Sequence, residues 1–244
     1  MKKTILTVFL FASVFSSTGL LAAGTFNWAG PYVGLNVGYA DGSSDWTNIY
    51  GTYEGGPSDV AQTDLASIDS QGVLGGLTAG YNFLFSSPYL IGIEGNFAFA
   101  GGMDDDTICL GDQGYGAHCA ADTNWVGDVA VRLGTTAMDR LFFFVKGGGA
   151  FGNFDYDVGN FIGFTDPSYN TETNTQIGWL AGFGVEYAAW DNMTVKLETN
   201  YMDFGDDRVN FHASSCIDCY NVDFGTNINQ SMWVIRLGLN YKLF

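Results

Sequence analysis

The feature that most constrains this chain is an alternation of apolar residues with small or polar residues. The segment 178–187 shows it most clearly, because its odd positions from Trp179 to Tyr187 are apolar and its even positions include three glycines and Glu186. A period of two residues is typical of a β-strand. The same phasing occurs in seven further segments: 30–41, 70–85, 89–101, 125–137, 141–156, 193–204 and 231–243. The sequence therefore predicts an all-β chain of eight strands.

The connections between these segments alternate in length. Short connections are expected at 86–88, 138–140 and 190–192, and long polar ones near 42–69, 102–124, 157–176 and 205–230. Outer-membrane barrels have an even number of strands, short periplasmic turns and long extracellular loops. A tilted strand needs roughly ten residues to cross their apolar band. The pattern predicts an eight-stranded antiparallel transmembrane β-barrel with both termini on the periplasmic side.

One parity of each segment carries large apolar side chains, and we expect this face to contact lipid. It includes Val33 to Tyr39, Val73 to Phe83, Ile91 to Phe99 and Trp233 to Tyr241 at alternate positions. The alternative is a soluble β-sandwich with these residues in its core. A sandwich would place polar side chains on the opposite, solvated face. Here that face is expected to be mostly glycine with a few charges, which favours the narrow interior of a barrel.

The charges on the inward parity are balanced. Four are acidic and four are basic: Glu94, Asp128, Glu186 and Glu198, with Arg132, Lys146, Lys196 and Arg236. A lone buried charge is strongly unfavourable, so these groups must pair with one another or with water. The interior of an eight-stranded barrel is narrow enough for side chains to fill it. We therefore predict a lumen plugged by ion pairs, with a proton or ion relay through Glu94 or Glu186 as the less favoured interpretation.

The N-terminus has the organisation of a cleavable secretory signal. Lys2 and Lys3 precede an apolar run over 5–15, and small residues then lead to Ala22 and Ala23. This order predicts a signal peptide over 1–23 and a barrel domain over 24–244. A membrane-anchoring helix is the alternative, but its apolar core would be too short for a span of about 20 residues.

An exported chain matures in an oxidising compartment, and this affects how its four cysteines are interpreted. Proximity would pair Cys109 with Cys119 and Cys216 with Cys219, although four cysteines allow three connectivities. A metal site is the alternative, because His212 has ligand-like spacing to the second pair. One Cys-x-x-Cys with a single histidine is not a complete tetrahedral set. We expect disulfides, no metal site and no cofactor.

The chain is strongly acidic, with 26 acidic and 9 basic residues and a formal net charge of −17. Binding to nucleic acid needs clustered Lys and Arg, so this class of partner is excluded. The densest acidic run is Asp104 to Asp106, in a predicted long connection. It lacks the regular ligand spacing of a dedicated calcium loop, so we expect a solvated acidic surface. Aromatic residues in the same connections, among them Trp46 and Phe211, are expected to pack the loops onto themselves.

Three stretches resemble the small outer-membrane proteins known as outer-membrane immunogenic proteins or porin-like surface antigens. They are 27–39, 182–205 and 236–244, which look like the first strand, the sixth and seventh strands, and the closing strand of that family. The resemblance implies an OmpA/OmpX-like barrel in a Gram-negative outer membrane, inserted by the barrel-assembly machinery. It also implies that Phe244 is part of the assembly signal, although Lys242 stands where that signal usually has an aromatic residue. Outer-membrane lipids and lipopolysaccharide are the implied surroundings, and a host or envelope ligand is an expected partner of the loops.

Three functions are compatible with a barrel of this kind. We favour a structural, surface-exposed antigen or adhesion-type protein, with a narrow porin-like channel for small solutes or ions as the alternative. An outer-membrane enzyme is less favoured, although the spacing of His212 and Ser214 is similar to the His-x-Ser of lipid A deacylases. Both residues fall in a predicted loop, so we expect no catalytic site and no enzyme.

Overall fold

The computed structural model describes residues 26–53, 56–58, 64–110, 116–137, 139–159, 170–215 and 220–243. The predicted signal peptide, Cys216, Cys219 and Phe244 lie outside these ranges, so the expectations for them stay predictions. Among the described residues there is no helix long and apolar enough to cross a membrane.

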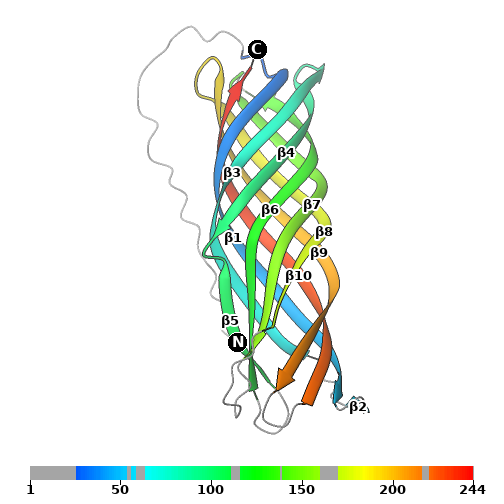
Figure 1. Cartoon of the computed structure of the whole chain (residues 1–244). Helices are drawn as coiled ribbons and strands as arrows, with labels where there is room; N and C mark the ends of the chain where they lie inside the picture. The colour runs from blue at the N-terminus through cyan, green and yellow to red at the C-terminus, as the bar shows by residue number, and fades with distance from the viewer. Residues whose placement is uncertain are drawn as a thin grey trace, which may run out of the picture.

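The described chain is made of β-strands, eight of them long (Figure 1). The long strands are β1 (Gly30–Tyr53), β3 (Asp64–Ser86), β4 (Tyr89–Gly101), β6 (Gly116–Ala137), β7 (Leu141–Gly159), β8 (Asn170–Ala188), β9 (Met193–Ser215) and β10 (Tyr220–Lys242). Two short strands accompany them, β2 (Gly56–Ser58) beside β1 and β5 (Asp104–Leu110) beside β6. Since β5 follows β4 along the same neighbour, β4 and β5 act as one interrupted strand.

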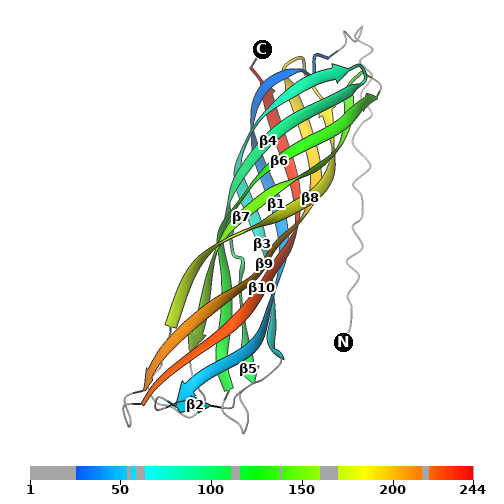
Figure 2. The same cartoon turned by 90° about the vertical axis from the view of Figure 1, so that its right-hand side faces the viewer.

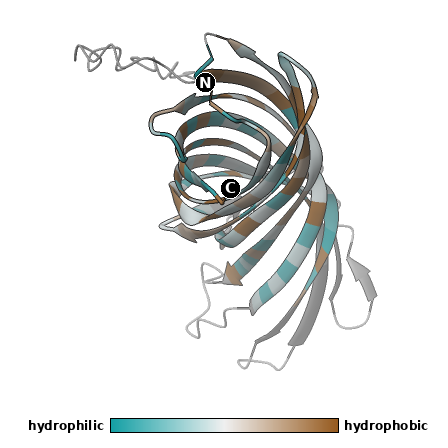
Figure 3. Ribbon diagram, turned by 90° about the horizontal axis from the view of Figure 1, so that it is seen from above, coloured by the Kyte–Doolittle hydropathy of each residue, from teal (hydrophilic) through white to brown (hydrophobic). Residues whose placement is uncertain are grey.

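The long strands close into a ring. Each one pairs antiparallel with the next along the chain, and β1 pairs with β10 from Tyr32↔Lys242 to Tyr53↔Val222. The view along the axis shows the ring directly (Figure 3). This confirms the predicted eight-stranded antiparallel barrel and rules out the sandwich alternative for the portion that would cross the membrane.

The short connections lie at one end of the ring, together with both ends of the described chain (Figure 1). They join β3 to β4, β6 to β7 and β8 to β9, as predicted. The backbone N–H of Lys242 donates to the carbonyl oxygen of Asn192 in the last of these turns, at 2.8 Å. The end of β10 is thereby fixed to the turn side of the barrel.

The predicted limits of the long connections are wrong, because the strands extend further into these segments than expected. Strand β1 continues to Tyr53 and β9 continues to Ser215, well into the segments expected to be loops. The alternation persists there, because Val209 is buried whereas Asp206 and Arg208 are exposed. The outward residues face water in place of lipid, so they are polar and do not display the apolar stripe that the prediction relied upon.

An apolar band surrounds the ring between two levels. Leu35, Val73 and Phe183 are about three-fifths exposed on its outer surface. Ring contacts of 5.7 Å and 5.1 Å join Trp179, Tyr201 and Trp233 on three neighbouring strands. We call these three residues, with Tyr39, the aromatic belt. Aromatic side chains are enriched at membrane interfaces, so the belt marks the limit of the band on the side away from the short turns.

Beyond the aromatic belt the ring divides into two sheets (Figure 2). The β8–β9 ladder ends at Trp179↔Asp203, and the β3–β4 ladder ends at Val73↔Gly101. In the described residues, one sheet then contains β9, β10, β1 and β3, and the other contains β8, β7, β6 and β5. Gly205 and Gly102, with φ of +72° and +68°, stand beside the two ends. Glycine adopts this left-handed region without steric cost, which lets each wall turn away from its neighbour.

Candidate functional site: the barrel interior

The interior at membrane level contains a cluster of charged side chains that we call the lumen network. It comprises all eight charges predicted on the inward parity: Glu94 of β4, Asp128 and Arg132 of β6, Lys146 of β7, Glu186 of β8, Lys196 and Glu198 of β9, and Arg236 of β10. Every one of these residues is buried. Strand alternation places them inside because the outward positions between them are apolar.

Glu94 is the most connected carboxylate of the lumen network. Its Oε1 lies 2.8 Å from Lys196 Nζ and 3.4 Å from Lys146 Nζ. Its Oε2 lies 3.2 Å from Arg132 Nη1, and that same nitrogen lies 3.0 Å from Glu186 Oε2. Three cations therefore share one acidic side chain, and the network closes across the lumen between β4 and the strands opposite.

A second group of contacts surrounds Asp128 and Glu198. Arg236 Nη1 lies 2.6 Å from Asp128 Oδ2 and 3.5 Å from Glu198 Oε1. Lys146 Nζ lies 3.3 Å from Asp128 Oδ1 and 3.2 Å from Glu198 Oε1. Lys196 Nζ completes the group at 3.2 Å from Glu198 Oε2. Since the four acids and four bases contact one another, the network carries no formal net charge.

Neutral polar residues add hydrogen bonds to the lumen network. The Tyr32 hydroxyl donates to Glu94 Oε2 at 2.8 Å, and Asn96 Nδ2 donates to Asp128 Oδ1 at 2.9 Å. Asn82 Oδ1 accepts from Arg132 Nε at 2.9 Å. These residues are uncharged, so the balance of inward charges did not predict them. The inward parity of their strands is the signal that would have found them.

An aromatic cluster fills the interior on the turn side of the lumen network. It contains Trp28, Leu90, Phe142, Phe144 and Ala188. Phe142 stacks on Phe144 with ring centroids 5.5 Å apart, and Trp28 lies 5.5 Å from Phe142. The Arg132 guanidinium lies 5.3 Å from each of the two Phe rings. We call this cluster the lower plug, taking the turn side as the lower end of the barrel, although that end stands at the top of Figure 1. The run 141–144 is apolar on both parities, but the period of two counted from the inward Lys146 places Phe142 and Phe144 on the inner face.

A larger apolar cluster fills the interior on the other side, and we call it the upper plug. Trp46 stacks on Phe211 at 5.9 Å and meets Tyr156 edge-on at 5.8 Å, while Phe154 lies 5.1 Å from Phe204. Its buried members also include Ile68, Leu74, Met103, Val126, Leu180, Met202, Ile228, Met232 and Val234. The expectation that the uncharged inward positions are mostly glycine is therefore wrong. Trp46 and Phe211 pack on each other as expected, but as inward residues of two strands.

Several buried polar atoms of the interior have no hydrogen-bond partner among the residues that the structure describes. They are Nε and Nη2 of Arg236, Nη2 of Arg132, and the Oδ1 atoms of Asn36, Asn200 and Asn240. Buried groups of this kind are normally satisfied by ordered water. The lumen network therefore has hydrogen-bonding capacity for water in addition to its ion pairs.

Cys109 of β5 and Cys119 of β6 lie on the far side of the aromatic belt from the short turns. Cys119 is disulfide-bonded. The β5–β6 register places Thr107 opposite Cys119 and Cys109 opposite Ala117, so Cys109 is on the neighbouring strand. The pairing of Cys109 with Cys119, like that of Cys216 with Cys219, stays a prediction. Within the part of the chain that the structure describes, no three His, Cys, Asp or Glu side chains are arranged to hold a metal.

Acidic residues face outward just beyond the aromatic belt. Asp104 of the predicted acidic run pairs in register with Asp122, which in turn pairs with Asp155. Partial burial and the neighbouring charges of Asp104 and Asp155 raise the pKa of the Asp122 carboxyl above its usual value. Repulsion between these carboxylates is thus a local cost of the acidic surface.

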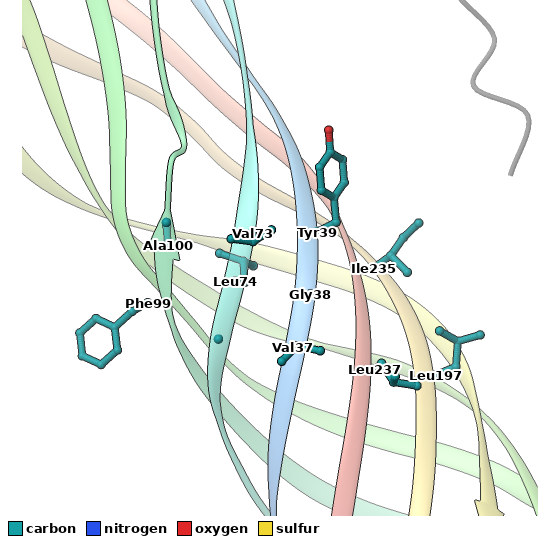
Figure 4. Close-up of a pocket in the computed structure, with 12 residues that line it drawn as sticks. Val37, Gly38, Tyr39, Val73, Leu74, Phe99, Ala100, Leu197, Ile235 and Leu237 are labelled. Carbon is teal, nitrogen blue, oxygen red and sulfur yellow. The ribbon is translucent and has the colours of Figure 1, made fainter.

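One depression lies on the outer wall, with a volume of about 700 Å³ (Figure 4). It is lined almost entirely by apolar groups, including Val37, Val73, Phe99 and Ile235. An added Cβ at Gly75 would have no neighbour within 4 Å, so this glycine helps to leave the space open. The depression belongs to the apolar band, where its lining contacts acyl chains.

A closed antiparallel ring with an apolar exterior, an aromatic rim and a polar, paired interior defines the class of outer-membrane β-barrel proteins. The family model described as "outer membrane protein beta-barrel domain" matches residues 7–240. The chain belongs to this family, and its location is the outer membrane.

Curated relatives narrow the assignment. The chain is 30% identical over 221 residues to the 31 kDa outer-membrane immunogenic protein of Brucella melitensis, covering 89% of this chain and 85% of the relative. The protein of the same name from Brucella suis gives the same values. Among solved structures, the outer membrane protein OprG of Pseudomonas aeruginosa matches with a TM-score of 0.54 and 12% identity, over 89% of this chain and 99% of OprG. OprG supports the fold alone, whereas the Brucella relatives confirm the resemblance to the immunogenic proteins.

Proposed function

We propose that the protein is a surface-exposed barrel with a closed interior, acting as an antigen or adhesion-type protein of the outer membrane. One observation carries this proposal: three consecutive layers of buried side chains fill the interior. The lower plug, the lumen network and the upper plug follow one another along the axis. The β-strands nevertheless continue past the aromatic belt, so a large part of the chain forms surface that projects from the membrane.

The relatives support a surface role, because their name describes them as immunogenic. Immune recognition of a bacterial envelope protein requires exposed segments. In the described part of this chain, such segments are the two projecting sheets. We further propose lipopolysaccharide and outer-membrane lipids as the surroundings of the apolar band, insertion by the barrel-assembly machinery, and a host or envelope ligand at the projecting end.

We also propose that the protein is not an enzyme. The acidic side chains of the interior are each held by at least one cation, as Glu186 is by Arg132. All four of these carboxylates are also buried within the filled interior, where a substrate would have no access to them. The side chains of His118, His212 and Ser214 lie outside the described ones, so the deacylase alternative is tested by mass spectrometry of lipid A from cells with and without the protein.

Surface exposure is tested by labelling intact cells with a membrane-impermeant maleimide. The variants are Asp206→Cys on the projecting part of β9 and Asp191→Cys in a short turn, both at exposed positions. Labelling of the first and protection of the second is the expected result. Wild-type protein measures the background from its own cysteines. Labelling of the Asp191→Cys variant alone would reverse the proposed orientation.

A narrow channel for small ions is the second candidate, and one observation favours it. The unpartnered groups of Arg236 and Asn200 in the interior can bind water, which could carry small ions or protons. Liposomes containing the protein and a trapped pH dye would then lose an imposed pH gradient faster than protein-free liposomes. Equal rates would reject this candidate.

A further inference from the structure

The depression on the outer wall lies where the β3–β4 ladder ends. The last pair of that ladder, Val73↔Gly101, is part of its lining. Figure 4 shows Phe99 on one side of the depression and Ile235 and Leu237 on the other. Its volume of about 700 Å³ is within the range of small-molecule sites, about 300–1,000 Å³. The apolar band is therefore hollowed here to a size that can hold part of a ligand.

A glycine produces the hollow. Gly75 of β3 stands in register between Val37 of β1 and Phe99 of β4, and an added Cβ on it would have no neighbour within 4 Å. The next outward positions of β3, Val73 and Leu77, carry large side chains. Because the depression is continuous with the apolar band, the chemistry that fits it is that of a lipid acyl chain.

A group of polar residues, which we call the polar rim, lies directly beyond the depression on the side away from the short turns. Tyr39 lines the depression with its ring, and its hydroxyl donates to Gln71 Oε1 at 2.7 Å. Gln71 Nε2 donates to Asp41 Oδ1 at 3.3 Å. Further along the same two strands, Ser43 Oγ donates to Asp69 Oδ1 at 3.1 Å. An amphipathic molecule with its chain in the depression would place its head group on this rim.

The polar rim carries negative charge with no base on its own strands. Asp41 and Asp69 are exposed, whereas β1 and β3 contain no Lys or Arg. Both bases of the adjacent β10, Arg236 and Lys242, are buried. Trp233 of β10 stands opposite Asp41 in register and is exposed, and the face of a Trp ring attracts cations. A head group with a cation complements this rim, and one with phosphate alone would be repelled by it.

We propose that the depression and the polar rim together bind one zwitterionic phospholipid, with an acyl chain along the depression and the ammonium group at Asp41 and Asp69. The rest of the apolar band offers acyl chains a surface without a hollow, so it does not distinguish one lipid from another. The inference goes beyond the proposed surface function and does not depend on it, because it requires only that the apolar band faces lipid.

The test is native mass spectrometry of the full-length barrel released from detergent micelles. The probes are phosphatidylethanolamine and phosphatidylglycerol with identical acyl chains, at low ionic strength and with EDTA present. Wild-type protein should bind one phosphatidylethanolamine at least about threefold more tightly than phosphatidylglycerol. Equal affinity overturns the proposal. Preference for phosphatidylglycerol when Mg²⁺ replaces EDTA would show a metal bridge at the carboxylates and also overturns it.

A pair of matched variants tests the depression itself. Gly75→Leu fills it, whereas Gly95→Leu adds the same side chain to the outer face of β4, outside the lining. An added Cβ at Gly95 has only ordinary contacts, the nearest at 3.6 Å from the Asp128 carbonyl oxygen. Both variants are first checked for folding by the shift in gel mobility on boiling. Gly75→Leu should lose the tight phosphatidylethanolamine site and Gly95→Leu should keep it.

Two results of this comparison would overturn the proposal. One is equal binding of phosphatidylethanolamine by the two variants. The other is a dimer of the wild-type protein that Gly75→Leu abolishes, because a second copy of the chain would then occupy the depression.

A double variant tests the polar rim. Asp41→Asn with Asp69→Asn should still bind a phospholipid but should lose the preference for phosphatidylethanolamine. Asp139→Asn with Asp191→Asn makes the same change of charge at exposed positions in two short turns and should keep the preference. Unchanged preference in the rim variant overturns the assigned role of the carboxylates. Purified protein has no orientation in a cell, so these measurements and the cell-labelling experiment can fail independently.

Discussion

Lys196 Nζ lies 2.8 Å from Glu94 Oε1, although the two residues are 102 positions apart and both side chains are fully buried. They come from β9 and β4, on different parts of the ring. The contact is therefore made across the lumen and connects strands that share no ladder. Ion pairs of this kind hold the walls of the barrel to one another through its interior.

Replacing Glu94 by Gln should destabilise the barrel strongly. Lys196, Lys146 and Arg132 would each lose a carboxylate, and breaking a buried pair by removing one partner costs about 3–5 kcal/mol. The free energy of unfolding in urea, measured in micelles, checks this. Glu172→Gln removes an exposed carboxylate on β8 and should change stability by less than about 0.5 kcal/mol.

The energetic coupling between Glu94 and Lys196 can be measured separately. In a double-mutant cycle with Lys196→Met, the loss in the double variant should be smaller than the sum of the single losses by about 0.5–3 kcal/mol. Strict additivity would mean that the contact contributes nothing, and would contradict the account of the network.

Gly80 lies where the interior has no room for a side chain. A Cβ there would collide with the ring and hydroxyl of Tyr32 and would lie 2.8 Å from the Ile93 carbonyl oxygen. Gly80→Ala should therefore displace Tyr32 from Glu94 and destabilise the barrel by about 1–3 kcal/mol. The matched control is Gly75→Ala on the same strand, where an added Cβ has no neighbour within 4 Å. Equal effects of the two changes would contradict this assignment of the inner face.

Removing a large side chain from the upper plug should destabilise the projecting sheets without affecting the barrel at membrane level. Trp46 is almost fully buried between the two projecting sheets, so Trp46→Ala should cost about 3–5 kcal/mol. Hydrogen exchange should accelerate in the projecting parts of β1, β7 and β9 and stay slow at membrane level. Trp190→Ala, at an exposed position in a short turn, is the control. Uniform acceleration along the whole barrel would show that the projecting sheets do not have separate stability.

Asp122 gives a pH-dependent prediction for the acidic surface. Burial, with Asp104 and Asp155 nearby, raises its pKa in the folded protein, so the folded state holds this proton more tightly than the unfolded state. The stabilisation is present below the ordinary aspartate pKa and is lost as pH rises through the raised value. Asp122→Asn should therefore melt at a higher temperature than wild type at neutral pH, and the difference should vanish in acid. Asp139→Asn, in a turn at the other end, is the control.

The strands at membrane level and their inward charges could be predicted because two different solvents act on the two faces. Lipid requires apolar residues on positions such as Leu35, and the narrow lumen accepts a charge such as Lys196 only beside an opposite one. Both constraints act at single positions with a period of two, so they can be read without knowing the fold. The projecting strands lacked this contrast, because Thr171, Thr173 and Thr175 face water.

Other features depend on register, which a pattern does not contain. The period of two counted from Lys146 places Phe142 on the inner face, but only the closed ring brings Phe142 against Trp28. The division into two sheets depends on where the β8–β9 ladder ends and on the positive φ of Gly205. A glycine in the sequence indicates that a positive φ is possible at that position, but it does not predict that the backbone adopts one.

Single-channel recording in planar bilayers tests the closed interior most directly. Purified, folded protein should give no steady conductance above the bare bilayer, because the lower plug, the lumen network and the upper plug follow one another along the axis. Refolding is verified beforehand by the shift in gel mobility between unboiled and boiled samples. Stable, reproducible openings by protein that passes this check would contradict the account.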